Sequence, residues 1–286
     1  GRDPALALPR GLGGLRAVTV PALHFGPDVP WPKTPDGDYA RAYLTPFLTE
    51  GSRAQMTNVD TRVGVLRLGE LALPVTINEA EYANSYVCAP YNHYVDYARE
   101  ELTTLGDPVA EAALGAALHA VGLGLRLAEI NRVVHVNNWL LSTNLYPPLS
   151  REQIRAITRM LVARYPHHAV VWRSVNTVQG PALWDAFRAE GYGWVASRQL
   201  YYQWPADDGF YNHAQRKIMR REAKLLAASP YEVLGPDDIE AGMLPRLKDL
   251  YDQLYLGKYS HHNPQFTLRF LETARVERTL GLRALR

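Results

Sequence analysis

The sequence predicts a mixed α/β fold, and two patterns carry that prediction. Residues 133–204 alternate apolar, β-branched runs with amphipathic ones, in the order strand, helix, strand, helix, strand. Residues 62–68 and 71–77 are apolar runs separated by Gly69 and Glu70, which is typical of a β-hairpin with a two-residue turn. Together they predict a central mixed sheet flanked by helices.

Composition fits an ordinary globular protein. The chain has 286 residues, of which 47% are hydrophobic and 21% charged, so it can build one large or two ordinary domains. Its single cysteine excludes an internal disulfide framework and favours a cytoplasmic location. No apolar run approaches the roughly 20 residues that span a bilayer, so we expect no membrane span.

The first 61 residues are expected to form an N-terminal arm and a proline-rich elaboration. Residues 16–20 fit a short strand and residues 39–49 a short helix. Five prolines within residues 21–38 predict an extended loop there. After the hairpin, residues 85–89 are expected to form a third strand.

Two helices are expected next, over residues 94–105 and 108–130. The second is rich in Ala, Leu and Gly, a composition that favours close packing on a sheet over a cofactor site.

The central region carries the clearest element boundaries. Residues 133–141 and 169–175 read as buried strands. Residues 150–165 show a helical apolar face and begin with Ser150 and Gln153, a capping-box pair. A helix over residues 180–190 ends at Gly191, and residues 194–204 predict a last strand.

A strongly basic helix is predicted over residues 211–226. Five cations against the single acid Glu222 give it a local charge of +4, whereas the whole chain has +2. Four of the cations share one helical face and are candidates to bind phosphates of RNA or of a nucleotide-sugar carrier. The alternative is a solvated helix face between domains. The candidate residues are Arg216, Lys217, Arg220, Arg221 and Lys224.

The remaining residues start a new α/β pattern without completing it. Residues 231–234 and 280–285 predict strands, residues 237–256 and 266–277 predict helices, and residues 258–266 predict a polar loop. Either the natural chain is longer, or this part pairs with the sheet of the first part.

Polar side chains gather at two predicted strand ends. Because ligands of open α/β sheets bind beyond the carboxyl ends of strands, these side chains are candidates to bind a substrate. The alternative is that they bond to turns and cap strands. Cys88 is expected to be inert core, and no metal site is expected at His167 and His168. The candidates are Asn84, Tyr86, His93, Asn137, Asn138, Ser142 and Asn144.

The polar loop near residue 260 is a candidate acceptor site. A histidine there can take a proton from an attacking amine near neutral pH. The alternative is a helix-connecting loop fixed by Pro264. We take Lys258, Tyr259, His261 and His262 as candidate catalytic residues, with Asn263 as a substrate ligand.

Residues 170–176, 182–192 and 197–202 resemble the C-terminal half of a GNAT-fold acyltransferase. They match its late strand, its helix ending in glycine and an aromatic residue, and its final strand. The resemblance implies a GNAT-like module over residues 62–206, a connecting helix over 207–228 and the front part of a second module over 229–286.

Two features depart from that pattern. The turn Leu145-Tyr146-Pro147-Pro148-Leu149 has no glycine and lacks two backbone N–H donors, so coenzyme A binding of the usual kind is not expected there. In addition, the helices of a GNAT module come between its first strand and its hairpin, whereas here helices follow the hairpin.

The basic helix after this module resembles the connecting region of Fem-type peptidyltransferases. These proteins pair two GNAT-like modules and move an aminoacyl group from tRNA to an amine without coenzyme A. The resemblance implies an acyltransferase that acts by direct attack on an amine-bearing small molecule or peptide, with tRNA as a partner and no further cofactor. Two alternatives stay open: an acyl-CoA-dependent N-acyltransferase that uses the second module, and a non-catalytic GNAT-fold binding protein.

Overall fold

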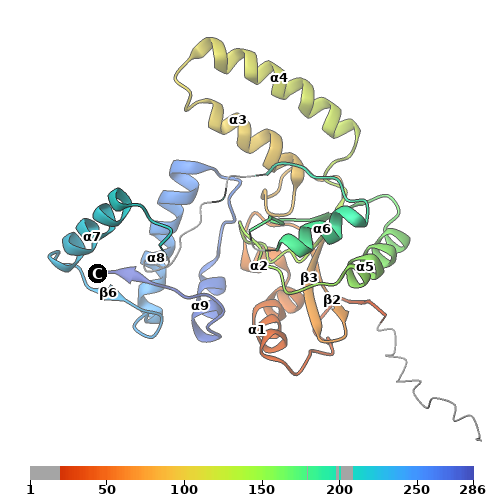
Figure 1. Ribbon diagram of the computed structural model, residues 1–286, viewed down its shortest axis with the longest axis horizontal. Helices are drawn as coiled ribbons and strands as arrows, with labels where there is room; N and C mark the ends of the chain where they lie inside the picture. Colours follow the sequence, from red (N-terminus) through yellow and green to blue (C-terminus); the bar gives the residue numbers. More distant parts are fainter. Residues whose placement is uncertain (1–19, 179, 198–199, 201–208) are drawn as a thin grey trace, which may run out of the picture.

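The fold is mixed α/β, as predicted, and is built on a five-stranded mixed sheet flanked by helices (Figure 1). The computed structural model describes residues 20–178, 180–197, 200 and 209–286. The strand order is β1-β2-β3-β4-β5, in which the first three pairings are antiparallel and β4 and β5 are parallel. The strands are β1 (Ala22–His24), β2 (Arg62–Leu68), β3 (Leu71–Asn78), β4 (Val133–Val136) and β5 (Ala169–Trp172).

The sheet separates two hydrophobic clusters. On one side, Val75, Val134 and Val136 pack against Ile157 and Leu161 of α5 (Arg151–Arg164). On the other side, α1 (Pro35–Glu50) covers β2 and β3, and α2 (Ser52–Gln55) packs against α1. The predicted hairpin with its two-residue turn and the predicted capping box of α5 are both confirmed.

The prediction of an extended loop over residues 21–38 is wrong at both ends. Strand β1 pairs with β2 inside this range, and α1 already begins at Pro35. A proline in the first turn of a helix removes an N–H that has no intrahelical acceptor, so it does not oppose the helix. Thr34 caps this helix by accepting a hydrogen bond from the Gly37 amide. The predicted strand at 16–20 lies outside the described residues except for Val20, which is not in a strand.

The predicted strand over residues 85–89 is also wrong. This segment is a turn in which the amides of Cys88 and Ala89 bond back to the Ser85 carbonyl. It leads into a π-helical turn, η1 (Asn92–Asp96), which continues as α3 (Tyr97–Leu102).

Helix α4 (Pro108–Leu127) packs on α3 and η1, so the predicted packing on the sheet is wrong. Together α3 and α4 form a hairpin that projects from the body (Figure 1). By length and composition, α4 is long and apolar enough to cross a membrane, contrary to the prediction that no apolar run reaches that length.

Strands β4 and β5 are shorter than predicted because the backbone turns sharply after each. Asn137 and Ser174 both have positive φ, at 56° and 66°, which ends the extended conformation. Helix α6 (Pro181–Ala189) ends before Gly191 as predicted. Residues 194–197 of the predicted last strand are not in a strand, and most of its remainder lies outside the described residues.

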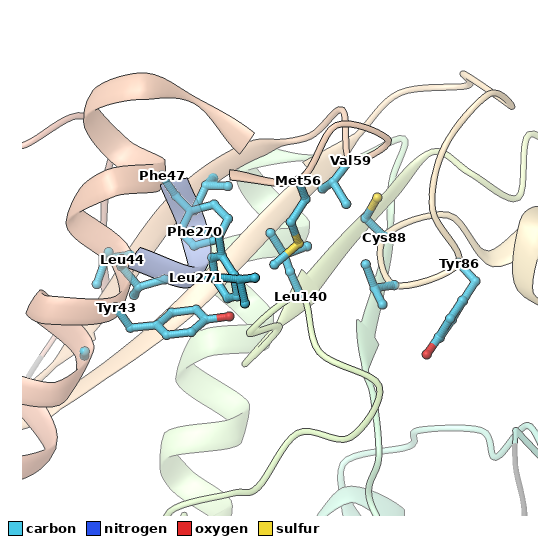
Figure 2. Close-up of a cluster of buried hydrophobic side chains, with 14 of the residues drawn as sticks. Tyr43, Leu44, Phe47, Met56, Val59, Tyr86, Cys88, Leu140, Phe270 and Leu271 are labelled. Atoms are coloured by element: carbon cyan, nitrogen blue, oxygen red, sulfur yellow. The ribbon is translucent and has the colours of Figure 1, made fainter. Parts of the chain in front are cut away.

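The C-terminal part is mainly helical and contributes to the core of the first part. Its elements are α7 (His213–Ala227), β6 (Val233–Leu234), η2 (Ala241–Met243), α8 (Leu244–Tyr251), the π-helix η3 (Asp252–Tyr259), α9 (Leu268–Val276) and β7 (Ala284–Leu285). Strands β6 and β7 pair with each other, not with the large sheet. Phe270 and Leu271 of α9 join Tyr43, Phe47 and Met56 in one buried cluster (Figure 2).

Candidate functional site

Backbone strain is concentrated where the two parallel strands end. Of the non-glycine residues with positive φ in the described part of the chain, three lie in the loops after β4 and β5: Asn137, Leu140 and Ser174. Each such conformation costs on the order of 1–3 kcal/mol and persists only where its surroundings hold it. Strain of this kind gathers at functional sites, so this edge of the sheet is the first place to look for one.

Three buried asparagines hold these loops. Asn137 Nδ2 donates to the Leu145 carbonyl at 2.8 Å, and Asn138 Nδ2 donates to Thr76 Oγ1 at 2.8 Å. Asn144 accepts from the Trp139 amide at 3.0 Å, while its own Nδ2 is buried without a hydrogen-bond partner among the described residues. For Asn137 and Asn138, these hydrogen bonds are the ones expected if the side chains cap the strand, which was the alternative to substrate binding. Ser142 is exposed on the same loop.

Arg173, directly after β5, ties these loops to the neighbouring turn. Its Nη1 donates to the Val87 carbonyl at 2.7 Å and to Asn138 Oδ1 at 3.0 Å. Its guanidinium carbon lies 5.9 Å from the centre of the Tyr86 ring. Arg173 is not among the residues predicted from the sequence, although a cation directly after a buried strand is a usable indication of a site.

His135 lies on β4 and was also missed. Its side chain is buried, and its Nδ1 has no hydrogen-bond partner in the part of the chain that the structure describes. Burial, together with the nearby charges of Arg173 and His93, lowers the pKa of His135 well below 6.5. The imidazole is therefore neutral at physiological pH.

His93, a predicted substrate residue, is brought to the same edge by η1. Its Nε2 is 3.2 Å from Ser197 Oγ, and its ring lies 5.5 Å from the Tyr86 ring and 4.6 Å from the Tyr94 ring. Burial raises the pKa of Tyr94, which Arg173 and Ser197 partly offset. We call His93, Tyr94, His135, Arg173 and Ser197 the strand-end cluster.

The loop near residue 260 docks beside this cluster. The His262 carbonyl accepts from the Tyr86 amide at 3.1 Å and from Ser85 Oγ at 2.7 Å. The His262 imidazole lies 3.7 Å from Glu100 of α3. His262 and His93 are therefore both adjacent to the segment that carries Tyr86.

The other predicted residues of this region are placed differently. Lys258 and Tyr259 lie exposed on the last turn of η3, so their prediction as loop residues is wrong, and His261 is exposed. Asn263 Nδ2 donates to the Tyr255 carbonyl at 2.9 Å and fixes the loop. Asn84 is likewise occupied, because its Oδ1 accepts from the Asp60 and Ser85 amides.

Cys88 is core, as predicted. Its thiol is fully buried, and burial raises the pKa of that thiol. A buried thiol that stays protonated is a poor nucleophile.

The predicted basic helix is present as α7, and its cations are exposed or half-buried. Among the described residues these five side chains form no ion pair and no hydrogen bond. A hollow of about 340 Å³ is lined by His213, Lys217, Arg220, Arg221 and Lys224.

The N-terminus of α5 has few donors left for a phosphate. The Gln153 amide bonds to Ser150 Oγ, and the Ser150 amide bonds to Gln153 Oε1. The Glu152 carboxylate accepts from its own amide, which lowers the pKa of that carboxyl. The capping box therefore occupies donors that a pyrophosphate would require.

No group of three or more metal-ligating side chains occurs among the described residues.

Comparison of the chain with protein family models, curated proteins and solved structures finds no match.

Proposed function

We propose that this protein is a GNAT-like acyltransferase that moves an acyl or aminoacyl group onto an amine at the strand-end cluster. The observation that carries the proposal is a histidine, His93, bonded to Ser197 beside a neutral buried histidine and an arginine. These groups lie where a parallel strand pair ends, which is the usual place for a ligand in such sheets.

The order of the elements supports the GNAT-like part of the proposal. Helices α1 and α2 stand between β1 and the β2–β3 hairpin, which is where a GNAT module has its first helices. Helix α5 connects the parallel strands β4 and β5, and α6 follows. In this description, α3 and α4 are an insertion between β3 and β4.

The proposed chemistry is direct attack of an amine on a bound ester. His93 takes the proton that the attacking amine loses and returns it to the ester oxygen of the donor, which leaves as a hydroxyl group when the acyl C–O bond breaks. The Arg173 charge stabilises the negative oxygen that develops on the carbonyl. Direct attack requires no covalent intermediate on the protein. This agrees with Cys88, because its buried thiol has a raised pKa and is a poor nucleophile.

For the acyl donor we propose an aminoacyl-tRNA. The cations of α7, which have no partner among the described residues, suit a phosphate backbone, whereas the capping box occupies two donors at the α5 terminus. Binding to RNA should weaken with salt, with a slope of about −3 in log–log form if four phosphates are contacted. Reversing Arg220 and Arg221 to Glu should weaken binding and flatten that slope, while leaving the unfolding free energy nearly unchanged.

The test is an amide-formation assay with purified protein, a panel of amine acceptors, and either charged tRNA or acyl-CoA as donor. We expect transfer from charged tRNA, with His93→Gln lowering kcat by about 10²–10⁴-fold. The exposed His119→Gln serves as a control and should keep full activity.

Other outcomes separate the alternatives. Transfer from acyl-CoA but not from charged tRNA would show that the acyl donor is acyl-CoA. Full activity of His93→Gln combined with loss in His262→Gln would move the base to the neighbouring loop. Binding without turnover for every donor would leave a non-catalytic binding protein.

A further inference from the structure

Helix α4 is apolar around most of its circumference, yet almost all of it faces solvent. Only 6% of its most apolar 18-residue window is buried, and Gly122 is its one buried residue. A helix that is hydrophobic all round is normally covered, either by protein or by lipid. The projecting position of the α3–α4 hairpin leaves this helix uncovered (Figure 1).

The two long faces of α4 differ in what they contact. The inner face consists of half-buried or buried residues spaced three and four apart: Glu111, Gly115, Leu118, Gly122 and Leu125. Ala110, in the first turn, is also half-buried. The opposite face is exposed over the whole helix and has the same spacing. We call it the outer strip; it consists of Val109, Ala113, Ala116, Ala120, Leu123 and Leu127.

No residue of the outer strip carries a charge or a hydrogen-bonding group. Between Pro108 and Leu127 the charged or titratable side chains are Glu111, His119 and Arg126. Arg126 stacks on the rings of Tyr82 and Tyr91, at 4.2 and 4.5 Å, and Glu111 accepts from the Gly106 amide. Two of the three are thus fixed at the ends of the helix, away from the strip.

The dimensions and chemistry of the strip argue against a protein as its cover. A helix of this length is about 30 Å long and about 10 Å wide, so the strip offers roughly 300 Å². A stable protein interface buries about 800 Å² per partner and includes hydrogen bonds and a polar rim. The strip falls short of that area and has no hydrogen bond to offer, whereas a lipid surface requires neither.

We propose that α4 docks on a phospholipid bilayer, lying in the plane of the interface with its outer strip in the acyl region. This placement is independent of the proposed catalytic activity. It keeps the inner face packed on α3 and on the η1 turn, where a Cβ at Gly122 would be 2.9 Å from Oη of Tyr91, the residue before η1. A spanning orientation would instead break this packing and detach Arg126 from both aromatic rings.

The charges beside the strip specify the type of lipid. Asp107, Glu111 and Glu129 outnumber Arg126 and Arg132, and Arg132 pairs with Glu129, so anionic headgroups are not favoured. Docking should therefore occur on neutral phosphatidylcholine vesicles and persist at high salt, because apolar burial is not screened. Attraction through the basic face of α7 would show the opposite dependence on both lipid and salt.

Vesicle flotation of the full chain tests the proposal. We expect the protein to float with phosphatidylcholine vesicles at both 0.1 M and 1 M salt, and Leu123→Glu to lower the partition coefficient at least tenfold. The matched control is Leu268→Glu at the start of α9, since Leu268 is 44% exposed and Leu123 is 52% exposed. This control and the Arg220→Glu/Arg221→Glu variant should both float like the wild type.

A depth measurement gives a second, independent readout. A fluorophore on Ala116→Cys should be quenched by lipids brominated on the acyl chains, because that position lies in the outer strip. The native Cys88 is buried and should not take the label under folded conditions. Circular dichroism of each variant shows whether it is folded.

Three results would overturn the proposal. They are absence of flotation by the wild type, flotation that Leu123→Glu leaves unchanged, and flotation that 1 M salt abolishes. A wild-type dimer that Leu123→Glu converts to a monomer, without vesicle binding, would assign the strip to a second copy of the chain instead.

Discussion

Single residues at the carboxyl ends of β4 and β5 give the structure its most specific chemistry. His135 is held neutral by burial, so its folded pKa lies below the 6.5 of an unfolded chain. As the pH falls below 6.5, His135 becomes protonated in the unfolded chain but stays neutral in the folded chain. The unfolding free energy is therefore highest above pH 6.5, and it decreases as the pH falls below 6.5.

This gives a prediction for His135→Gln. Between pH 6.5 and 5.5 the wild-type unfolding free energy should fall by up to about 1.4 kcal/mol more than that of the variant. Urea denaturation at pH 7.5, 6.5 and 5.5 measures the difference. The exposed His119→Gln should retain the wild-type pH dependence, and an unchanged dependence in His135→Gln would mean that His135 is protonated in the folded protein.

From the sequence, the polar residues at this edge of the sheet could be predicted, but the role of each residue could not. Runs of asparagine after an apolar strand correctly indicated a polar strand end, and the structure shows the amides of Asn137 and Asn138 bonded to the protein. Arg173 and His135 could not be selected in the same way. Their proximity depends on the parallel pairing of β4 with β5 and on the turn at Val87, which are long-range contacts.

At the scale of elements, the two inner-face glycines of α4 offer a matched comparison. Glycine inside a helix costs roughly 0.5–1 kcal/mol relative to alanine. A Cβ at Gly115 would meet nothing within 4 Å, but one at Gly122 would lie 2.9 Å from Tyr91 Oη and 3.2 Å from Val95 Cγ1. Only the second substitution pushes the hairpin away from its support.

We therefore expect opposite signs for the two alanine variants. Gly115→Ala should raise the unfolding free energy by about 0.5–1 kcal/mol. Gly122→Ala should lower it, by about 1–3 kcal/mol if the crowding resembles an overpacked core. Thermal unfolding of both variants provides the measurement. Equal stabilisation by both would show that α4 does not rest on η1 as described.

Elements with strong local patterns were predicted well, and those that depend on distant partners were not. The capping box of α5 and the hairpin turn at Gly69 are local, and both were found. Strand β1 has only three residues and exists because it pairs with β2, some forty residues later. The π-helix η3 gave no periodic pattern that separates it from a helix followed by a loop.

At the scale of the whole molecule, the C-terminal part completes the core of the sheet module. Phe270 of α9 lies 6.0 Å from the Tyr43 ring and 4.7 Å from the Phe266 ring, and is 4% exposed. A core shared by the two parts predicts a single unfolding transition. The sequence suggested a second module in this region, but it gave no indication that α9 packs against α1.

Phe270→Ala should lower the unfolding free energy by about 3–5 kcal/mol, as expected for emptying a packed aromatic site. Far-ultraviolet circular dichroism and tyrosine fluorescence should report the same shifted transition. Leu268→Ala, at an exposed position on the same helix, should be within about 0.5 kcal/mol of the wild type. Two separate transitions, only one of them shifted by Phe270→Ala, would mean that the two parts fold independently.

The contacts between residues 55–58 and residues 261–267 also set the order of events during synthesis. The Thr57 amide bonds to the Gln265 carbonyl, the Thr267 amide bonds to the Gln55 carbonyl, and Asn58 Nδ2 donates to the carbonyls of His261 and Asn263. These partners are more than 200 residues apart in the chain. At about 5–20 residues per second, a ribosome needs on the order of 10–40 s to make the second partner after the first. Through that interval Met56 and Phe47 have no α9 to cover them, so the nascent chain exposes apolar surface and should depend on chaperone protection until residue 276, the end of α9, has emerged.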